Sequence, residues 1–132
     1  CEARAQELGL RECLTFTGAL TKADWIALSA DYDVFINTTH YDNTPVSVVE
    51  AMALGFPIVS TDVGGLPWLL QDGRTALLTP DGDAGAMCAA IRRICGAPDL
   101  ARALSRNARA EAERFDWEQV KRLWLEALEA RR

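Results

Sequence analysis

The chain has 132 residues, of which 49% are hydrophobic and 25% are charged, the size and composition of one globular domain with a buried core. Its 19 acidic and 14 basic residues give a formal net charge of -5. Because the basic residues form no stripe with interleaved aromatic residues, the charge pattern argues against nucleic acid as a partner.

Apolar, β-branched runs alternate with helical patterns in the first part of the chain. Four such runs predict β-strands, at residues 14–17, 34–37, 57–61 and 75–79. This alternation is typical of a parallel sheet with helices on its faces. The sequence therefore predicts an α/β fold.

Three helices are predicted between these strands. The first covers residues 21–30 and begins at a capping box with Asp24 in place of the usual Glu. The second covers residues 44–55, with Thr44-Pro45 as its N-cap and first helical residue. The third is short and covers residues 66–73.

After the fourth predicted strand the pattern is helical only. Helices are predicted at about residues 84–95 and 99–114, and a second capping box at Asp116 begins a last helix over about 117–131. One face of this last helix is apolar, which more often indicates packing than a ligand site. The residues of this face are Trp117, Val120, Trp124 and Leu128.

The cysteines and the single histidine lack the spacing of a metal site. The four cysteines contain no C-x-x-C pair, and His40 is far from all of them in the sequence, so no metal is expected. Cys88 and Cys95 are seven residues apart in a helical pattern and are predicted to share a buried face. Free cysteines fit a reducing cytoplasm.

The sequence shows no membrane span and no targeting signal, and its first residues resemble the interior of a helix. No apolar run reaches the roughly 18 residues of a membrane span, and the first residues do not resemble a secretory signal. Ala3, Ala5 and Leu8 are typical of the middle or end of a helix and have no cap before them. We therefore expect a cytoplasmic chain whose natural start is missing.

Two loops that follow predicted strands are candidates for a ligand site, because ligands of open α/β sheets bind at the carboxyl ends of the strands. The polar loop after residues 34–37 contains His40 and leads into a helix. The loop after residues 57–61 contains Gly64 and Gly65, whose missing Cβ atoms let backbone approach a ligand closely.

The helix that begins near Pro45 offers an anion site. The N–H groups of Val46 and Ser47 have no partner within the helix and point out of its positive end, where a diphosphate fits. Many helix N-termini, however, bind only water or their own cap. Glu50 is the only ionisable residue within residues 44–59 and lies one turn beyond Val46 on the same side.

Two roles are open for Glu50, and two for His40. A carboxylate at position 50 can accept hydrogen bonds from the hydroxyls of a ribose, or it can form a salt bridge to a neighbouring helix. His40 has no acid or nucleophile fixed beside it by spacing, so it is a weak candidate for a general base. A ligand contact is the favoured role for His40.

The segment from Asp42 to Pro67 carries a family motif. An acid is followed, after seven residues, by Glu-Ala-Met-Ala-x-Gly-x-Pro-Ile-Val-Ser-Thr-x-x-Gly-Gly-x-Pro. This resembles the C-terminal, donor-binding domain of retaining GT-B glycosyltransferases of family 4, the "glycosyl transferases group 1" set. The resemblance implies a single domain over residues 1–132, with a Rossmann-like parallel sheet that is incomplete at its N-terminus.

The resemblance also implies a role for each residue of the motif. Glu50 would bind the ribose, and Asp42 would lie by the donor sugar as the catalytic residue. Backbone amides around residues 44–47 would meet the sugar and the distal phosphate, while Gly64 and Gly65 would form a wall near the donor. The expected substrate-binding residues are His40, Asn43, Thr44, Pro45, Val46, Ser47, Glu50, Gly64 and Gly65.

For the whole enzyme, the resemblance implies retaining hexosyl transfer from a nucleoside-diphosphate sugar, with no metal or other cofactor. In relatives, an Arg and a Lys that neutralise the diphosphate lie upstream of the segment equivalent to this chain. The N-terminal domain would hold the acceptor, a glycan or lipid, and would provide any membrane association. We therefore expect this chain alone to be inactive. The alternatives are a non-catalytic nucleotide-binding or interaction module and a GT-B nucleotide-sugar epimerase.

The sequence departs from the family pattern at two positions of the motif region. Asp42 replaces the more frequent Glu, and Trp68 stands where many relatives carry Glu. The family's strand order, 3-2-1-4-5-6, also leaves a gap between the predicted strand at residues 14–17 and the other three. Either this strand pairs locally, or a second copy covers the exposed sheet edge in a homodimer.

Overall fold

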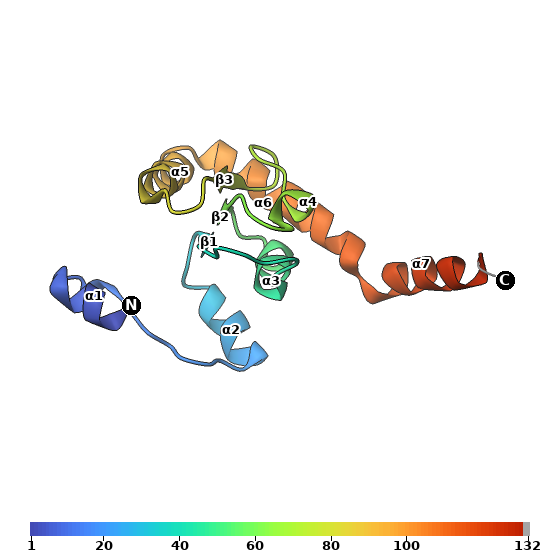
Figure 1. Cartoon of the computed structure of the whole chain (residues 1–132), viewed down its shortest axis with the longest axis horizontal. Coiled ribbons are helices and arrows are strands. Elements are labelled where there is room, and N and C mark those ends of the chain that lie inside the picture. The colour runs from blue at the N-terminus through green and yellow to red at the C-terminus, as the bar shows by residue number, and fades with distance from the viewer. Residues whose placement is uncertain (131–132) are drawn as a thin grey trace. The chain divides into compact units, whose positions relative to one another are not determined.

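The computed structural model describes residues 1–130, and the chain divides into two compact units, Cys1–Asp31 and Tyr32–Arg132 (Figure 1). The first unit contains helix α1 (Glu2–Glu7), the 3₁₀ turn η1 (Arg11–Cys13) and helix α2 (Lys22–Ser29). Thr21 caps α2 as predicted, because its hydroxyl accepts a hydrogen bond from the N–H of Asp24, but the Asp24 carboxylate accepts from that hydroxyl and not from the backbone N–H that a full capping box would use.

The strand predicted at residues 14–17 is not formed, so this prediction was wrong. Leu14 has extended backbone angles, yet no segment among residues 1–130 pairs with it in a ladder. Its neighbour Phe16 instead lies under the guanidinium group of Arg11, 5.4 Å from the ring centre. A single extended segment without a hydrogen-bonded neighbour is not a strand, and the proposed local pairing does not occur.

The second unit contains a parallel sheet, as the sequence predicted, formed by three of the four predicted strands. Its strands are β1 (Phe35–Asn37), β2 (Ile58–Thr61) and β3 (Leu77–Thr79), in the order β1-β2-β3. All four residues of the central strand β2 are buried. Such continuous burial is typical of parallel strands with covered faces, and it explains the unbroken apolar run that predicted β2.

Six helical segments accompany the sheet in the described part of this unit. They are α3 (Val46–Leu54), α4 (Leu66–Leu69), α5 (Ala84–Gly96), α6 (Pro98–Ala112), the 3₁₀ turn η2 (Glu113–Phe115) and α7 (Trp117–Glu129).

The boundaries of α3 and α4 are among those that differ from the prediction. α3 begins one residue later, because Pro45 has an extended ψ of 117° and acts as the cap in place of Thr44. α4 ends at Leu69 and not at residue 73. The chain beyond it is held by other bonds, since the N–H of Gln71 donates to the hydroxyl of Thr75.

A buried cluster joins the sheet to α5 and α6. It consists of Val59, Leu77, Ile94 and Leu104, which are at most 3% exposed. Three partly buried residues on the same face of α5 as Ile94 pack against this cluster: Met87, Ala90 and Ile91. Cys88 and Cys95 are exposed, so the prediction that they share a buried face was wrong. Each lies one position, or about 100° of helix, beyond a residue of the buried face.

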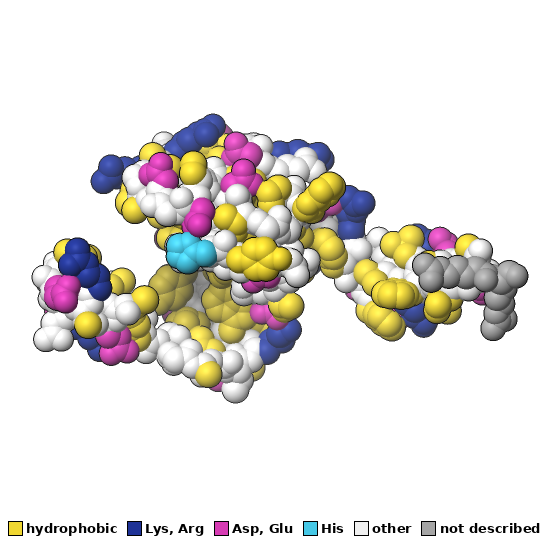
Figure 2. All heavy atoms as spheres, in the orientation of Figure 1, with side chains coloured by type: hydrophobic (Ala, Val, Ile, Leu, Met, Phe, Trp, Pro, Cys, Tyr) yellow, Lys and Arg dark blue, Asp and Glu magenta, His cyan; other side chains and the backbone are white. Residues whose placement is uncertain are grey.

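The apolar face predicted for the last helix is confirmed as a stripe but not as a packing surface. No residue of α7 is buried, and Trp117, Trp124 and Leu128 are each at least 60% exposed. Figure 2 shows the hydrophobic side chains gathered at the surface of this helix. Its predicted end, residue 131, lies outside the described residues. None of the helices formed by residues 1–130 is long and apolar enough to cross a membrane.

Candidate functional site

The loops after β1 and β2 are in direct backbone contact. The N–H of Gly65 donates a hydrogen bond to the carbonyl oxygen of Asp42 at 2.8 Å. A Cβ atom at Gly64 would lie 2.1 Å from that oxygen, and one at Gly65 would lie 1.7 Å from the carbonyl oxygen of Asn43. The two glycines are therefore required for the contact between the loops. This is a different reason from the close approach to a ligand that the sequence suggested.

The contact between the loops positions the N-terminus of α3. Pro45, its cap residue, is buried, whereas Thr44, Val46 and Ser47 are exposed. No side chain caps the helix, and among residues 1–130 nothing accepts a hydrogen bond from the N–H of Val46 or Ser47. Two N–H groups without a partner at the positive end of a nine-residue helix are what the predicted anion site requires, and anion binding there stays a prediction.

Glu50 lies on α3 one turn beyond Val46 and is half-buried. Its neighbours Val48, Ala51 and Met52 are all fully buried. A carboxylate at this boundary is partly shielded from water, so a hydrogen bond to a bound ligand is stronger than it would be in bulk solvent. Spacing on one helix therefore brings the predicted phosphate-binding and ribose-binding groups to the same side of α3.

The other end of α3 is held by α6, which the sequence did not predict. Gly55 ends the helix in the left-handed region with φ of 82°, and its carbonyl oxygen accepts a hydrogen bond of 2.5 Å from the hydroxyl of Ser105. The guanidinium group of Arg109 donates to the carbonyl oxygen of Ala53. Ser105 and Arg109 are some fifty residues away in the sequence, where no local pattern marks them as partners of α3.

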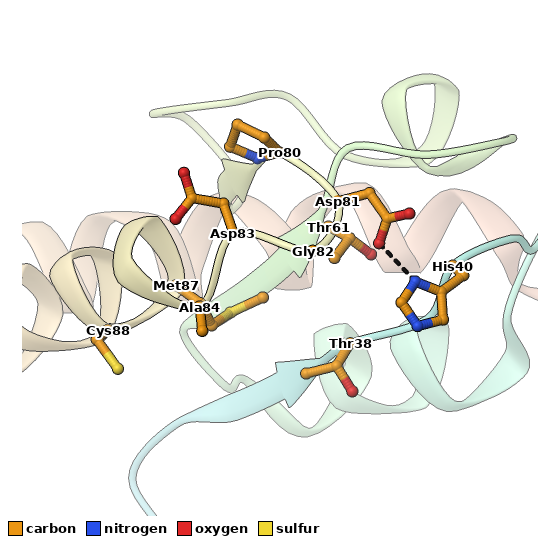
Figure 3. Close-up of a pocket in the computed structure, with 10 residues that line it drawn as sticks. All are labelled: Thr38, His40, Thr61, Pro80, Asp81, Gly82, Asp83, Ala84, Met87 and Cys88. Carbon is orange, nitrogen blue, oxygen red and sulfur yellow. Dashed lines mark hydrogen bonds and ion pairs between the residues drawn. The ribbon is translucent and has the colours of Figure 1, made fainter.

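His40 lines a cavity of about 330 Å³ at the carboxyl ends of the strands. Its Nδ1 donates a hydrogen bond of 2.7 Å to Oδ1 of Asp81, from the loop after β3 (Figure 3). The side chain of His40 is 81% exposed and that of Asp81 is 42% exposed. The sequence showed no acid beside His40. In the structure the acid beside His40 is Asp81, whose hydrogen bond orients the imidazole ring and involves Nδ1 and not Nε2.

A second hollow, of about 340 Å³, lies beside the N-terminus of α3. It is lined by Asn43, Thr44, Gly65, Trp68, Leu69 and Phe115. The predicted site residues are thus divided between two hollows, because His40 belongs to the first and Asn43, Thr44 and Gly65 belong to the second. Glu50 lines neither of them. Within residues 1–130, no three His, Cys, Asp or Glu side chains are grouped as a metal ion would require.

Comparison with known proteins identifies a family. The profile of the family described as "Glycosyl transferases group 1" matches residues 1–96. The D-inositol 3-phosphate glycosyltransferase of Saccharomonospora viridis is 33% identical over 113 residues, which cover 86% of this chain and 26% of that enzyme. The enzyme of the same name from Mycobacterium tuberculosis is 33% identical over 117 residues, or 86% of this chain and 24% of the enzyme.

Solved structures agree with this assignment. The sucrose-phosphate synthase of Thermosynechococcus elongatus is 31% identical and superimposes with a TM-score of 0.86, over 98% of this chain and 34% of that protein. The Anabaena protein HepE in complex with UDP is 27% identical, with a TM-score of 0.88 over 98% of this chain and 35% of that protein. The chain thus spans about a quarter of the curated relatives and a third of these structures. It belongs to the glycosyl transferases group 1 family and has part of the α/β fold of GT-B glycosyltransferases.

Proposed function

We propose that this chain binds the nucleoside-diphosphate sugar for a retaining hexosyltransferase. The observation that carries the proposal is the N-terminus of α3, where the exposed N–H groups of Val46 and Ser47 have no partner among residues 1–130 and Glu50 follows one turn later. HepE, whose structure matches this chain over 98% of its length, has been solved with UDP and with UDP-glucose.

In this proposal each group on α3 binds a different part of the donor. The N–H groups of Val46 and Ser47 hold the diphosphate, and Glu50 accepts hydrogen bonds from the ribose hydroxyls. Asp42 lies by the sugar at the reacting carbon. In an enzyme of the relatives' length, the acceptor, a glycan or lipid, is bound by the other domain. Retention of configuration rests on the family resemblance.

Binding of the diphosphate gives the first testable prediction. UDP is expected to bind this chain at least about tenfold more tightly than uridine, because only UDP presents an anion to the N-terminus of α3. Since helix amides hold the phosphates, the affinity should be the same in EDTA and in added Mg²⁺ or Mn²⁺. Isothermal titration calorimetry measures both. Equal affinities for UDP and uridine, or binding of UDP only with metal, would contradict the proposal.

The edge strand of the sheet gives a second prediction. Within the described residues β1 forms a ladder with β2 alone, so it is an edge strand, to which another strand can be added. We propose that a second copy of the chain covers this edge in a homodimer. Sedimentation equilibrium should then give twice the chain mass of 14.5 kDa. A monomer at all concentrations up to about 100 μM would overturn this part of the proposal.

A further inference from the structure

Trp68 projects from the surface of the second unit. It is 94% exposed, although Trp is highly buried on average in folded proteins. It lies on α4, whose first and last residues, Leu66 and Leu69, are buried. Trp68 is therefore carried by a short helix that is anchored on both sides of it.

Backbone hydrogen bonds connect Trp68 to the loop that carries Asp42. The N–H of Trp68 donates to the carbonyl oxygen of Gly65 at 3.1 Å, and the N–H of Gly65 donates to the carbonyl oxygen of Asp42 at 2.8 Å. The backbone of Trp68 consequently has a defined position relative to the loop that precedes α3. This distinguishes it from the other exposed tryptophans, Trp117 and Trp124, which belong to the apolar stripe of α7.

The hollow beside Trp68 combines an aromatic surface with polar groups. Its volume of about 340 Å³ lies at the lower end of the range for ligand sites. Trp68 and Phe115 supply apolar surface, while the exposed side chains of Asn43 and Thr44 supply an amide and a hydroxyl. Apolar surface together with a few hydrogen-bonding groups suits a sugar ring, which has C–H groups on its faces and hydroxyl groups around its edge.

The direction in which the donor lies along α3 determines which part of the donor molecule enters this hollow. With the ribose at Glu50 and the diphosphate at the first amides of α3, the distal phosphate points toward the residues that precede the helix. Those residues are Asn43 and Thr44, which line the hollow. The group attached to the distal phosphate is the transferred sugar.

We propose that the ring of the donor sugar stacks on the indole of Trp68, with Asn43 and Thr44 binding its hydroxyls, so that Trp68 determines which sugars the chain accepts. This inference rests on the proposed function and adds a specificity-determining residue to it. The family pattern has Glu at this position in many members, so the aromatic platform is a feature of this chain.

Calorimetry with UDP and UDP-glucose tests the platform. The wild-type chain should bind UDP-glucose about three- to tenfold more tightly than UDP, because only UDP-glucose presents a ring to Trp68. Trp68→Ala should bind UDP with unchanged affinity and lose the extra affinity for UDP-glucose. Trp68→Phe should retain most of it, because it keeps an aromatic face. The control Trp124→Ala, which alters an exposed Trp outside the hollow, should change neither affinity.

Each other outcome overturns a different statement. If Trp68→Ala keeps the preference for UDP-glucose, or if the wild-type chain shows no preference, the sugar does not stack on Trp68 and the proposed function stands. If Trp68→Ala weakens UDP and UDP-glucose equally, Trp68 contacts the nucleotide and the sugar platform is wrong. If the wild-type chain binds neither compound, both the inference and the proposed function fail.

Discussion

Replacing Gly65 by alanine is expected to destabilise the second unit by about 3 kcal/mol and to abolish UDP binding. The new Cβ would lie 1.7 Å from the carbonyl oxygen of Asn43 and 2.7 Å from its carbonyl carbon, so one of the two loops must move. Such a movement breaks the hydrogen bond from Gly65 to Asp42 and displaces the entry to α3. Thermal unfolding followed by circular dichroism measures the stability, and calorimetry measures the affinity for UDP.

Gly96→Ala is the matched control for this substitution. Gly96 is the last residue of α5, and a Cβ there would meet no atom within 4 Å. Alanine at this helical position should leave UDP binding unchanged and stabilise the unit by about 0.5–1 kcal/mol. A Gly65→Ala variant as stable as the wild-type chain, with the same affinity for UDP, would show that the two loops do not meet as described.

Substitution of Glu50 is expected to have the second large effect. Glu50→Gln should weaken UDP binding by about 10- to 100-fold, because hydrogen bonds to a charged carboxylate contribute more than those to a neutral amide. The affinity for 2′-deoxy-UDP should fall much less, since this ligand lacks one of the two hydroxyls that Glu50 is proposed to bind. Calorimetry of both ligands with both proteins forms a cycle that isolates the contact.

Glu111→Gln provides the control for a carboxylate of similar burial. The side chain of Glu111 is 25% exposed and forms an ion pair with Arg114 at the end of α6, outside the proposed site. This variant should bind UDP as the wild-type chain does. The ribose assignment fails if Glu50→Gln also binds UDP with unchanged affinity, or if it discriminates against 2′-deoxy-UDP as strongly as the wild-type chain.

Most of the second unit could be predicted from local patterns. The apolar run at β2 is buried throughout and that at β3 for the most part, so their hydrophobicity directly reflects their environment, whereas β1 is only partly buried. Gly55 ends α3 with a positive φ, as a glycine at a helix C-terminus predicts. Asp116 caps α7 by accepting a hydrogen bond from the N–H of Glu118. All of these features depend on residues close together in the sequence.

The wrong predictions concern features that depend on distant partners. Residues 14–17 have the composition of a strand, but a strand also requires a neighbour, and composition does not specify one. The seven-residue spacing of Cys88 and Cys95 correctly places them on one side of α5, but spacing alone does not say which side faces the core. The same holds for the apolar stripe of α7, which is present but exposed.

In the candidate site, too, positions within one helix could be predicted from the sequence and contacts between distant segments could not. Val46, Ser47 and Glu50 belong to one helix, so their relative positions follow from helical geometry and could be predicted. The partner of His40, Asp81, is 41 residues away and is brought near only by the parallel sheet. The contact of Gly64 and Gly65 with the loop after β1 likewise required the structure. This contact holds the two glycines against the loop that leads into α3.

The most direct test of the central claim, that the N-terminus of α3 binds a nucleoside diphosphate, is a titration of the ¹⁵N-labelled chain with UDP followed by amide chemical shifts. The largest changes are expected at Val46 and Ser47, with smaller changes near Glu50, because the phosphates would contact these amides directly. Changes confined to residues 81–88, beside the cavity of His40, with Val46 and Ser47 unaffected, would contradict the claim.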